Sequence, residues 1–221
     1  MPPRMFIEQA VRNPGYFVTV LVTVVVSITL HELAHGLTAL RHGDHTPRAL
    51  GHMTLNPAVH MPPMAFLALL LAGIAWGSMP INPARLRGRY AEAKVALAGP
   101  MTNLGLALLA LTAVGLWQRY TDDPEPARPV RNAWLFLRVF GTTNLALFAF
   151  NLLPVPPLDG SHILANLSPG YRRFASDPNR QGIAVGLFVG AFLLSGYLFG
   201  YLNRAAMAFV SWVNGGNWVW F

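Results

Sequence analysis

Five stretches of the chain are apolar enough to lie in lipid, and they constrain its fold more than any other feature. They cover residues 16–40, 64–79, 95–117, 133–153 and 182–203. A helix needs about 20 residues to cross the hydrocarbon core, so four of them are long enough and the second is short. In lipid the backbone must satisfy its own hydrogen bonds, which makes each spanning segment helical.

The composition agrees with a membrane protein. Only 11% of the 221 residues are charged, against about 25% in a typical soluble domain. The sequence predicts an all-α integral membrane protein, a bundle of four spanning helices with 64–79 as a short re-entrant or non-spanning segment. Loop 41–63 adds a candidate short β element at Gly51–Leu55. The longest connection, 155–181, has 27 residues, too few for an independent domain of about 50 or more.

The charge pattern gives an orientation. The formal net charge is +7, but the basic residues are scattered and only one is Lys, so no nucleic-acid partner is expected. If 64–79 does not span, the basic loops 41–63, 80–94 and 155–181 share one side, and the acidic connection 118–132 lies opposite. By the positive-inside rule the basic side is cytoplasmic, and both termini lie outside.

The pentapeptide His31-Glu32-Leu33-Ala34-His35 lies inside the first apolar stretch. Positions i and i+4 share one face of a helix, so His31 and His35 can bind one metal ion, with Glu32 offset to act on water. The residue counts give about 0.003 chance matches to this motif. The alternative is a pair of hydrogen-bonded membrane histidines, but an acidic group near the bilayer centre costs about 2.5–3.5 kcal/mol. We therefore predict a zinc site.

A catalytic zinc usually has three protein ligands and an open position. The chain has no Cys, so the third ligand must be His, Asp or Glu. Asp159 is the best candidate, because it follows an apolar segment in a Pro-broken stretch that can return into the protein. An exposed Asp-Gly turn is the alternative for Asp159, and His60 and His52 are the other candidate ligands.

Three motifs together resemble the site-2 protease family of intramembrane zinc metalloproteases. They are HELAHG, the loop GDHTPRALGHMTLNPAVHM and NLLPVPPLDG, and the resemblance extends over the PINPARLR and AGPMTN stretches. It implies His31, His35 and Asp159 as ligands of one Zn²⁺ per chain, and Glu32 as the catalytic carboxylate. The sequence departs from many relatives at His52, at Pro62 and at Ser161-His162, none of which is a proposed ligand.

The resemblance also implies a function and its partners. We expect a single polytopic domain over residues 1–221, with its catalytic core at 16–165 and without the PDZ or CBS domains of larger relatives. It would hydrolyse peptide bonds within or near transmembrane segments of membrane-anchored proteins in a bacterial cytoplasmic membrane, with the active site nearer the cytoplasm. Substrate choice would rest on the membrane region or on a regulatory membrane partner.

Four further residues are candidates for substrate binding. Asn151 matches a family position suspected of contacting substrate, and Pro154 belongs to the stretch 152–158, which we expect to be partly extended and to pair with an unwound substrate. Asn103 is a candidate too, although a lone Asn often joins membrane helices. His60 completes the set.

Two other functions fit an ionisable membrane site. A metal transporter would need ligands but no non-ligating carboxylate beside the first His, so Glu32 argues against it. A non-catalytic, protease-like scaffold would usually have lost one of His31, Glu32, His35 and Asp159.

Overall fold

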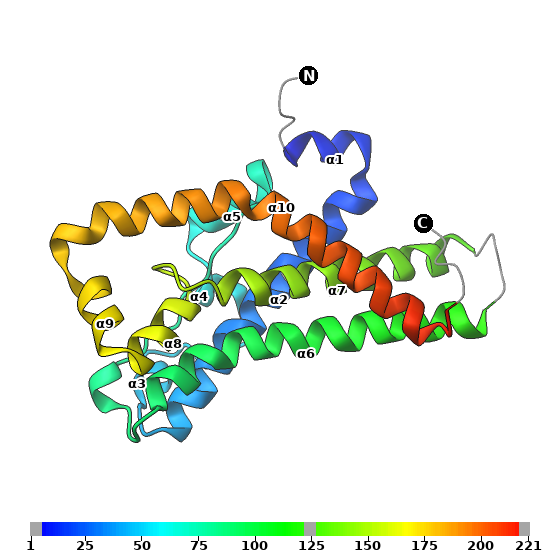
Figure 1. The fold of residues 1–221 in the computed structure, drawn as a ribbon. Coiled ribbons are helices and arrows are strands. Elements are labelled where there is room, and N and C mark those ends of the chain that lie inside the picture. Colours follow the sequence, from blue (N-terminus) through cyan, green and yellow to red (C-terminus); the bar gives the residue numbers. More distant parts are fainter. Residues whose placement is uncertain (1–5, 122–126, 217–221) are drawn as a thin grey trace.

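The computed structural model describes residues 6–121 and 127–216 (Figure 1). In this part of the chain the structure consists of helices joined by turns and irregular segments, with no strand. The α-helices are α1 (Gln9–Arg12), α2 (Pro14–Arg41), α3 (Thr46–Ala49), α4 (Pro57–His60), α5 (Pro63–Ala72), α6 (Ala91–Tyr120), α7 (Arg128–Asn151), α8 (Asp159–Leu167), α9 (Pro169–Ser176) and α10 (Gln181–Val213). Three short 3₁₀ helices join them, η1 (Phe6–Glu8), η2 (Pro83–Arg85) and η3 (Pro178–Arg180).

Four of these helices, α2, α6, α7 and α10, are long and apolar enough to cross a membrane. They coincide with the four long apolar stretches of the sequence, so the all-α membrane fold is confirmed. Large apolar side chains such as Leu109 and Leu193 are 72% exposed, as expected of surfaces that face lipid rather than water. The acidic residues Asp122, Asp123 and Glu125 lie outside the described residues.

The bundle core is built on α6, which runs beside α2, α7 and α10 (Figure 1). Small residues allow close approach, since a Cβ added at Gly141 of α7 would lie 2.7 Å from Leu111 of α6. At the far end of α6, a Cβ at Gly115 would meet Val213 of α10 at the same distance. Leu111, Val114, Ala206 and Val210 form a buried apolar cluster there.

The short apolar stretch 64–79 does not span, as the sequence predicted. Its helix α5 has 10 residues, a length of about 15 Å. Gly73 ends it in the left-handed conformation, at a φ of 72°, and the chain then returns without helix through residues 74–82. The return is fixed to the end of α2, because the Asn82 N–H donates to Asp44 Oδ2 at 2.7 Å. The chain therefore returns to the end of α2 from which it left, and this path is compatible with the re-entrant form of the prediction.

The expected β element at Gly51–Leu55 is wrong. Gly51 has a φ of 75°, which breaks an extended run. The His52 N–H donates to the Pro47 carbonyl and the Thr54 N–H to the His52 carbonyl. Because local turns use these backbone groups, none of the described segments pairs with this stretch as a strand.

Candidate active site

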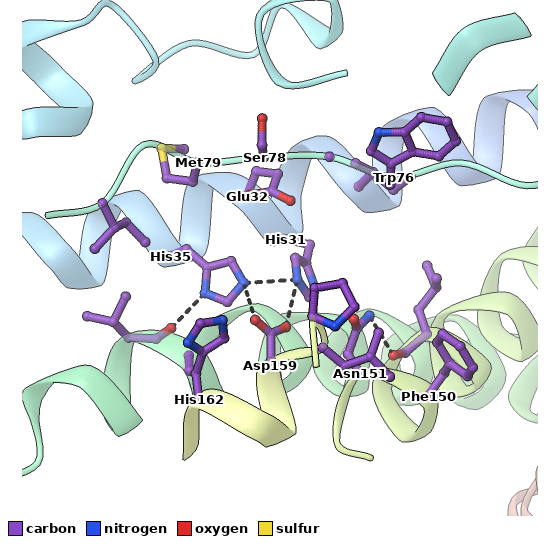
Figure 2. Close-up of a pocket in the computed structure, with 18 of the residues that line it drawn as sticks. His31, Glu32, His35, Trp76, Ser78, Met79, Phe150, Asn151, Asp159 and His162 are labelled. Atoms are coloured by element: carbon purple, nitrogen blue, oxygen red, sulfur yellow. Dashed lines mark hydrogen bonds and ion pairs between the residues drawn. The ribbon is translucent and has the colours of Figure 1, made fainter. Parts of the chain in front are cut away.

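His31 and His35 lie one turn apart on the buried face of α2, exposed by 8% and 5%. Their rings meet edge to face (Figure 2), and their two Nε2 atoms are 2.9 Å apart. Each Nδ1 is occupied by a neighbour on α6. His31 Nδ1 lies 2.6 Å from Asn103 Oδ1, and His35 Nδ1 donates to the Val95 carbonyl at 2.7 Å. The two Nε2 atoms therefore face each other on the side away from α6's acceptors, where both can act as ligands of one ion.

Asp159 opens α8 and completes the cluster. Its Oδ2 is 3.1 Å from His31 Nε2 and its Oδ1 is 3.4 Å from His35 Nε2. A tight turn puts it there, because a Cβ at Gly160 would collide with the backbone of Leu152 and Leu153. Burial acts to raise the pKa of Asp159, but the hydrogen bonds and charges of His31 and His35 outweigh it and hold the pKa well below its usual range.

The three side chains can hold a metal ion. Their donor atoms lie within 4.8 Å of one another, and two imidazoles with one carboxylate are a donor set that zinc accepts. The rings fit against α6 because Gly99 has no side chain; a Cβ there would collide with both Nε2 atoms. His31, His35 and Asp159 therefore fit the expected site.

The alternative ligands lie outside this cluster. Among the described residues, the cluster contains neither His60 nor His52. His60 is buried and its Nε2 donates to the Thr54 carbonyl at 2.8 Å. The ring of His52 lies 6.1 Å from that of His60. Both histidines belong to the loop that supports the re-entrant segment.

Glu32 points away from the histidine pair, towards the returning stretch 74–79 (Figure 2). It is 7% exposed and hydrogen-bonds to none of the described residues. A Cβ at Gly77 would lie 2.7 Å from Glu32 Oε1 and 2.6 Å from Ile28, so only Gly allows this backbone so close to the carboxylate.

A cavity of about 710 Å³ joins these groups. Its walls include the three candidate ligands, Glu32, the stretch Ile74–Met79, and the aromatic rings of Phe150, Phe188 and Phe192. Figure 2 shows Trp76, Ser78 and Met79 on one side and His162 and Asn151 on the other. The combination of an apolar wall with a few convergent polar groups is typical of a ligand site.

The returning stretch 74–79 has backbone groups available beside this cavity. The Ile74 N–H donates to the Ala68 carbonyl and the Ser78 N–H to the His60 carbonyl. The N–H groups of Ala75, Trp76, Gly77 and Met79 bond to none of the described residues. The sequence analysis did not single out this stretch, although Gly73 and Gly77 in an apolar run were its visible signal.

The stretch 152–158 is different from what the sequence suggested. It is folded into turns, and its N–H groups at Leu152, Leu153, Val155 and Leu158 all bond within the stretch or to the end of α7. The remaining three residues are prolines, so the stretch has no free donor for strand pairing. The Pro154 carbonyl accepts from the Tyr171 hydroxyl at 2.9 Å, away from the cavity wall. Asn151 lines the cavity, and its Nδ2 donates to the Leu147 carbonyl.

Asn103 is fully buried between helices and contacts a candidate ligand. Its Nδ2 donates to Asn144 Oδ1 at 2.8 Å, so it joins α2, α6 and α7. Both of its expected roles, helix packing and a place in the site, are therefore compatible with its contacts. Asn144 was not singled out from the sequence.

Comparison with known proteins gives a consistent family. Residues 126–196 match the model of peptidase family M50. A Bacillus subtilis protein named "Putative zinc metalloprotease YwhC" is 35% identical over 181 residues, which cover 80% of this chain and 82% of that protein. "Putative zinc metalloprotease Rip2" of Mycobacterium tuberculosis is 35% identical over 202 residues, covering 87% and 74%. No solved structure matches the chain significantly.

Proposed function

The chain belongs to peptidase family M50, the site-2 protease family, and we propose that it is an intramembrane zinc metalloendopeptidase. It would hydrolyse peptide bonds within or near the transmembrane segments of membrane-anchored proteins. One observation carries the proposal. Three side chains that can bind a metal, His31, His35 and Asp159, converge inside a membrane bundle. The carboxylate of Glu32 stands apart from them but lines the same cavity.

His31, His35 and Asp159 would hold one zinc ion per chain. When bound, zinc lowers the pKa of a water molecule and polarises a carbonyl, which are the two effects that amide hydrolysis needs. The carboxylate of Asp159 supplies negative charge, and the two imidazoles bind through neutral Nε2 atoms.

Glu32 would move the proton. It lines the same cavity as the ligand cluster without belonging to the cluster, and there it would accept a proton from the attacking water and pass it to the leaving amine. A metal carrier has no use for such a group. Glu32 therefore favours hydrolysis over transport, and its presence beside all three ligands argues against an inactive scaffold.

The stretch 74–79 would bind the substrate backbone. A helix hides its carbonyls in its own hydrogen bonds, so a substrate helix must unwind before hydrolysis. The unbonded N–H groups of Ala75, Trp76 and Gly77 can pair with an extended segment, as in strand addition. The other side of that segment would face Asn151, His162 and the three phenylalanines of the cavity wall.

The site would lie nearer the cytoplasmic side of a bacterial inner membrane. The ligands lie in the second half of α2, towards Arg41, and the loops beyond this end are basic. Arg85, Arg87 and Arg89 follow the re-entrant stretch at the same end, in line with the positive-inside rule.

The test compares cleavage by the wild type and by Glu32→Gln, each at equal abundance in membranes. Quantitative proteomics of membrane-anchored proteins should find fragments that require the wild type and disappear in Glu32→Gln, whereas zinc content stays equal. Glu8→Gln, the same chemical change on η1, is the control and should behave as the wild type. Cleavage by Glu32→Gln at the wild-type rate would refute the mechanism.

A further inference from the structure

The face of α6 that meets the two histidines repeats their spacing. His31 and His35 are four residues apart on α2, and their Nδ1 partners, Asn103 and Val95, lie four residues on either side of Gly99 on α6. The two helices run in opposite directions, so one helix provides the acceptors for both rings. An outer partner on Nδ1 fixes which ring nitrogen is left for a metal.

The two acceptors differ in how firmly they fix the proton. The Val95 carbonyl can only accept, so Nδ1 of His35 must carry a hydrogen, and in the neutral ring the lone pair then lies on Nε2. The partner of His31 is the side-chain amide of Asn103, which has an accepting oxygen at one end and a donating nitrogen at the other. A flipped amide would present N–H to Nδ1 and require the wrong tautomer of His31.

Asn144 determines the direction of that amide. Its Nδ2 donates to the Phe140 carbonyl at 2.9 Å and to Ser27 Oγ at 2.8 Å. A serine hydroxyl can donate or accept, but a backbone carbonyl only accepts, so the Phe140 carbonyl requires the NH₂ end of Asn144. The oxygen end of Asn144 then faces Asn103, which must present its own NH₂. The oxygen of Asn103 is left for His31.

Both asparagines are 0% exposed. If one of them loses a hydrogen-bond partner, water cannot take its place, and the unpaired buried group is costly. The chain of bonds from the Phe140 carbonyl through Asn144 and Asn103 ends at His31 Nδ1. Among the described residues, Asn144 hydrogen-bonds to no candidate ligand, and it does not line the cavity. We propose that Asn144 is a positioning residue that sets the tautomer and ring orientation of His31 through Asn103. The proposal rests on the metal site of the proposed function.

The expected effect is a loss of zinc affinity. Removing an outer partner of a metal-bound histidine typically weakens binding about 10–100-fold. Asn103→Leu removes the acceptor directly and should show a loss in this range. Asn144→Leu leaves the acceptor in place but frees the Asn103 amide to flip, so it should also weaken zinc binding.

A double-variant experiment separates positioning from simple packing. The carboxylate introduced by Asn103→Asp accepts at both ends, so His31 keeps its acceptor whichever way the group lies. In that background Asn144→Leu should no longer weaken zinc binding, and it should improve it by removing an oxygen that faces the new carboxylate. If Asn144 served only to pack the helices, Asn144→Leu would weaken binding equally in both backgrounds.

The measurement is zinc affinity by competition with a chelator, on purified full-length protein in lipid nanodiscs. Thr142→Val is the matched control, because Thr142 lies on the same helix and its hydroxyl donates, within the described part of the chain, only to the Arg138 and Val139 carbonyls. It should bind zinc as the wild type does. Melting of the metal-free proteins, and the visible spectrum after Co²⁺ loading, report the fold and the ligand set.

Equal losses from Asn144→Leu in both backgrounds, or no loss in the wild-type background, would overturn the proposal. If Asn144→Leu does not fold, the comparison of Asn103→Leu with Asn103→Asp decides, because the proposal requires a loss in the first that the second avoids. These readouts do not depend on proteolysis. Absence of zinc binding by the wild type would instead refute the metal site itself.

Discussion

Replacement of Gly99 by Ala would test the geometry of the metal site directly. The new Cβ would lie 2.5 Å from His31 Nε2 and 2.6 Å from His31 Cε1, and closer still to His35 Nε2. Such atoms are normally separated by at least about 3.5 Å. The rings, or α6 itself, must therefore move by about 1 Å.

That displacement is larger than a metal site tolerates. Ligand distances in zinc sites stay within about 0.2 Å of their ideal values. Overpacking of this kind costs about 1–3 kcal/mol, which corresponds to a loss of zinc affinity of about 5- to 140-fold. Because the rings cannot relax without losing their bonds to Val95 and Asn103, we expect the upper part of this range.

The assay is chelator competition on the purified protein, with Gly105→Ala as the matched control. Gly105 lies on the same helix, and a Cβ there would have no neighbour within 4 Å. Ala stabilises a helix relative to Gly by about 0.5–1 kcal/mol, so Gly105→Ala should bind zinc normally and melt no lower than the wild type. Wild-type zinc affinity in Gly99→Ala would show that the imidazoles do not converge over α6, and the site geometry would be wrong.

Three further predictions concern the metal, the acid stability and the topology. Purified protein should hold one zinc per chain, and phenanthroline should remove it and stop cleavage, so full activity without metal would exclude the mechanism. Burial acts to raise the pKa of Asp44, but hydrogen bonds from Thr46 and Asn82 lower it below its usual value; the carboxylate thus stabilises the fold above about pH 4 and stops doing so as the pH falls further. Asp44→Asn should therefore lower the melting temperature at pH 7, and the difference in melting temperature from the wild type should disappear below about pH 4. Single cysteines at His45 and Arg87, in a chain that has no native Cys, should label from the same side of intact membranes, and opposite accessibility would contradict the re-entrant segment.

The features predictable from sequence are those set by local geometry. The spacing of His31 and His35 places them on one helix face whatever surrounds the helix, and the shortness of 64–79 rules out a span. Asp159 lies 124 residues beyond His35, and no periodicity connects them. Its choice over His60 and His52 rested on its place in a Pro-broken stretch after an apolar segment and was strengthened by the family resemblance. The turn at Gly160 that brings it to the histidines is visible only in three dimensions.

The predictions that failed depended on partners. A strand at Gly51–Leu55 needs a neighbouring strand, and the stretch 152–158 needs free N–H groups to bind a substrate backbone. In both cases local turns use the backbone first. Among the described residues, N–H groups without a backbone partner lie instead at 75–77, where the returning chain passes Glu32.

The asparagine pair shows how far a sequence argument can reach inside a membrane. A buried amide in lipid needs a partner because water is absent there, so Asn103 and Asn144, each within a predicted span, could have been paired as a hypothesis. The spacing of Val95, Gly99 and Asn103 also puts them on one face of their helix. Neither pattern tells which way α6 is turned relative to α2, and that rotation decides whether Asn103 meets another asparagine alone or also His31. Close packing at Gly99 fits the observed rotation, because a missing Cβ there leaves room for the rings of His31 and His35. The same small residue that lets α6 approach α2 thus shapes the candidate metal site.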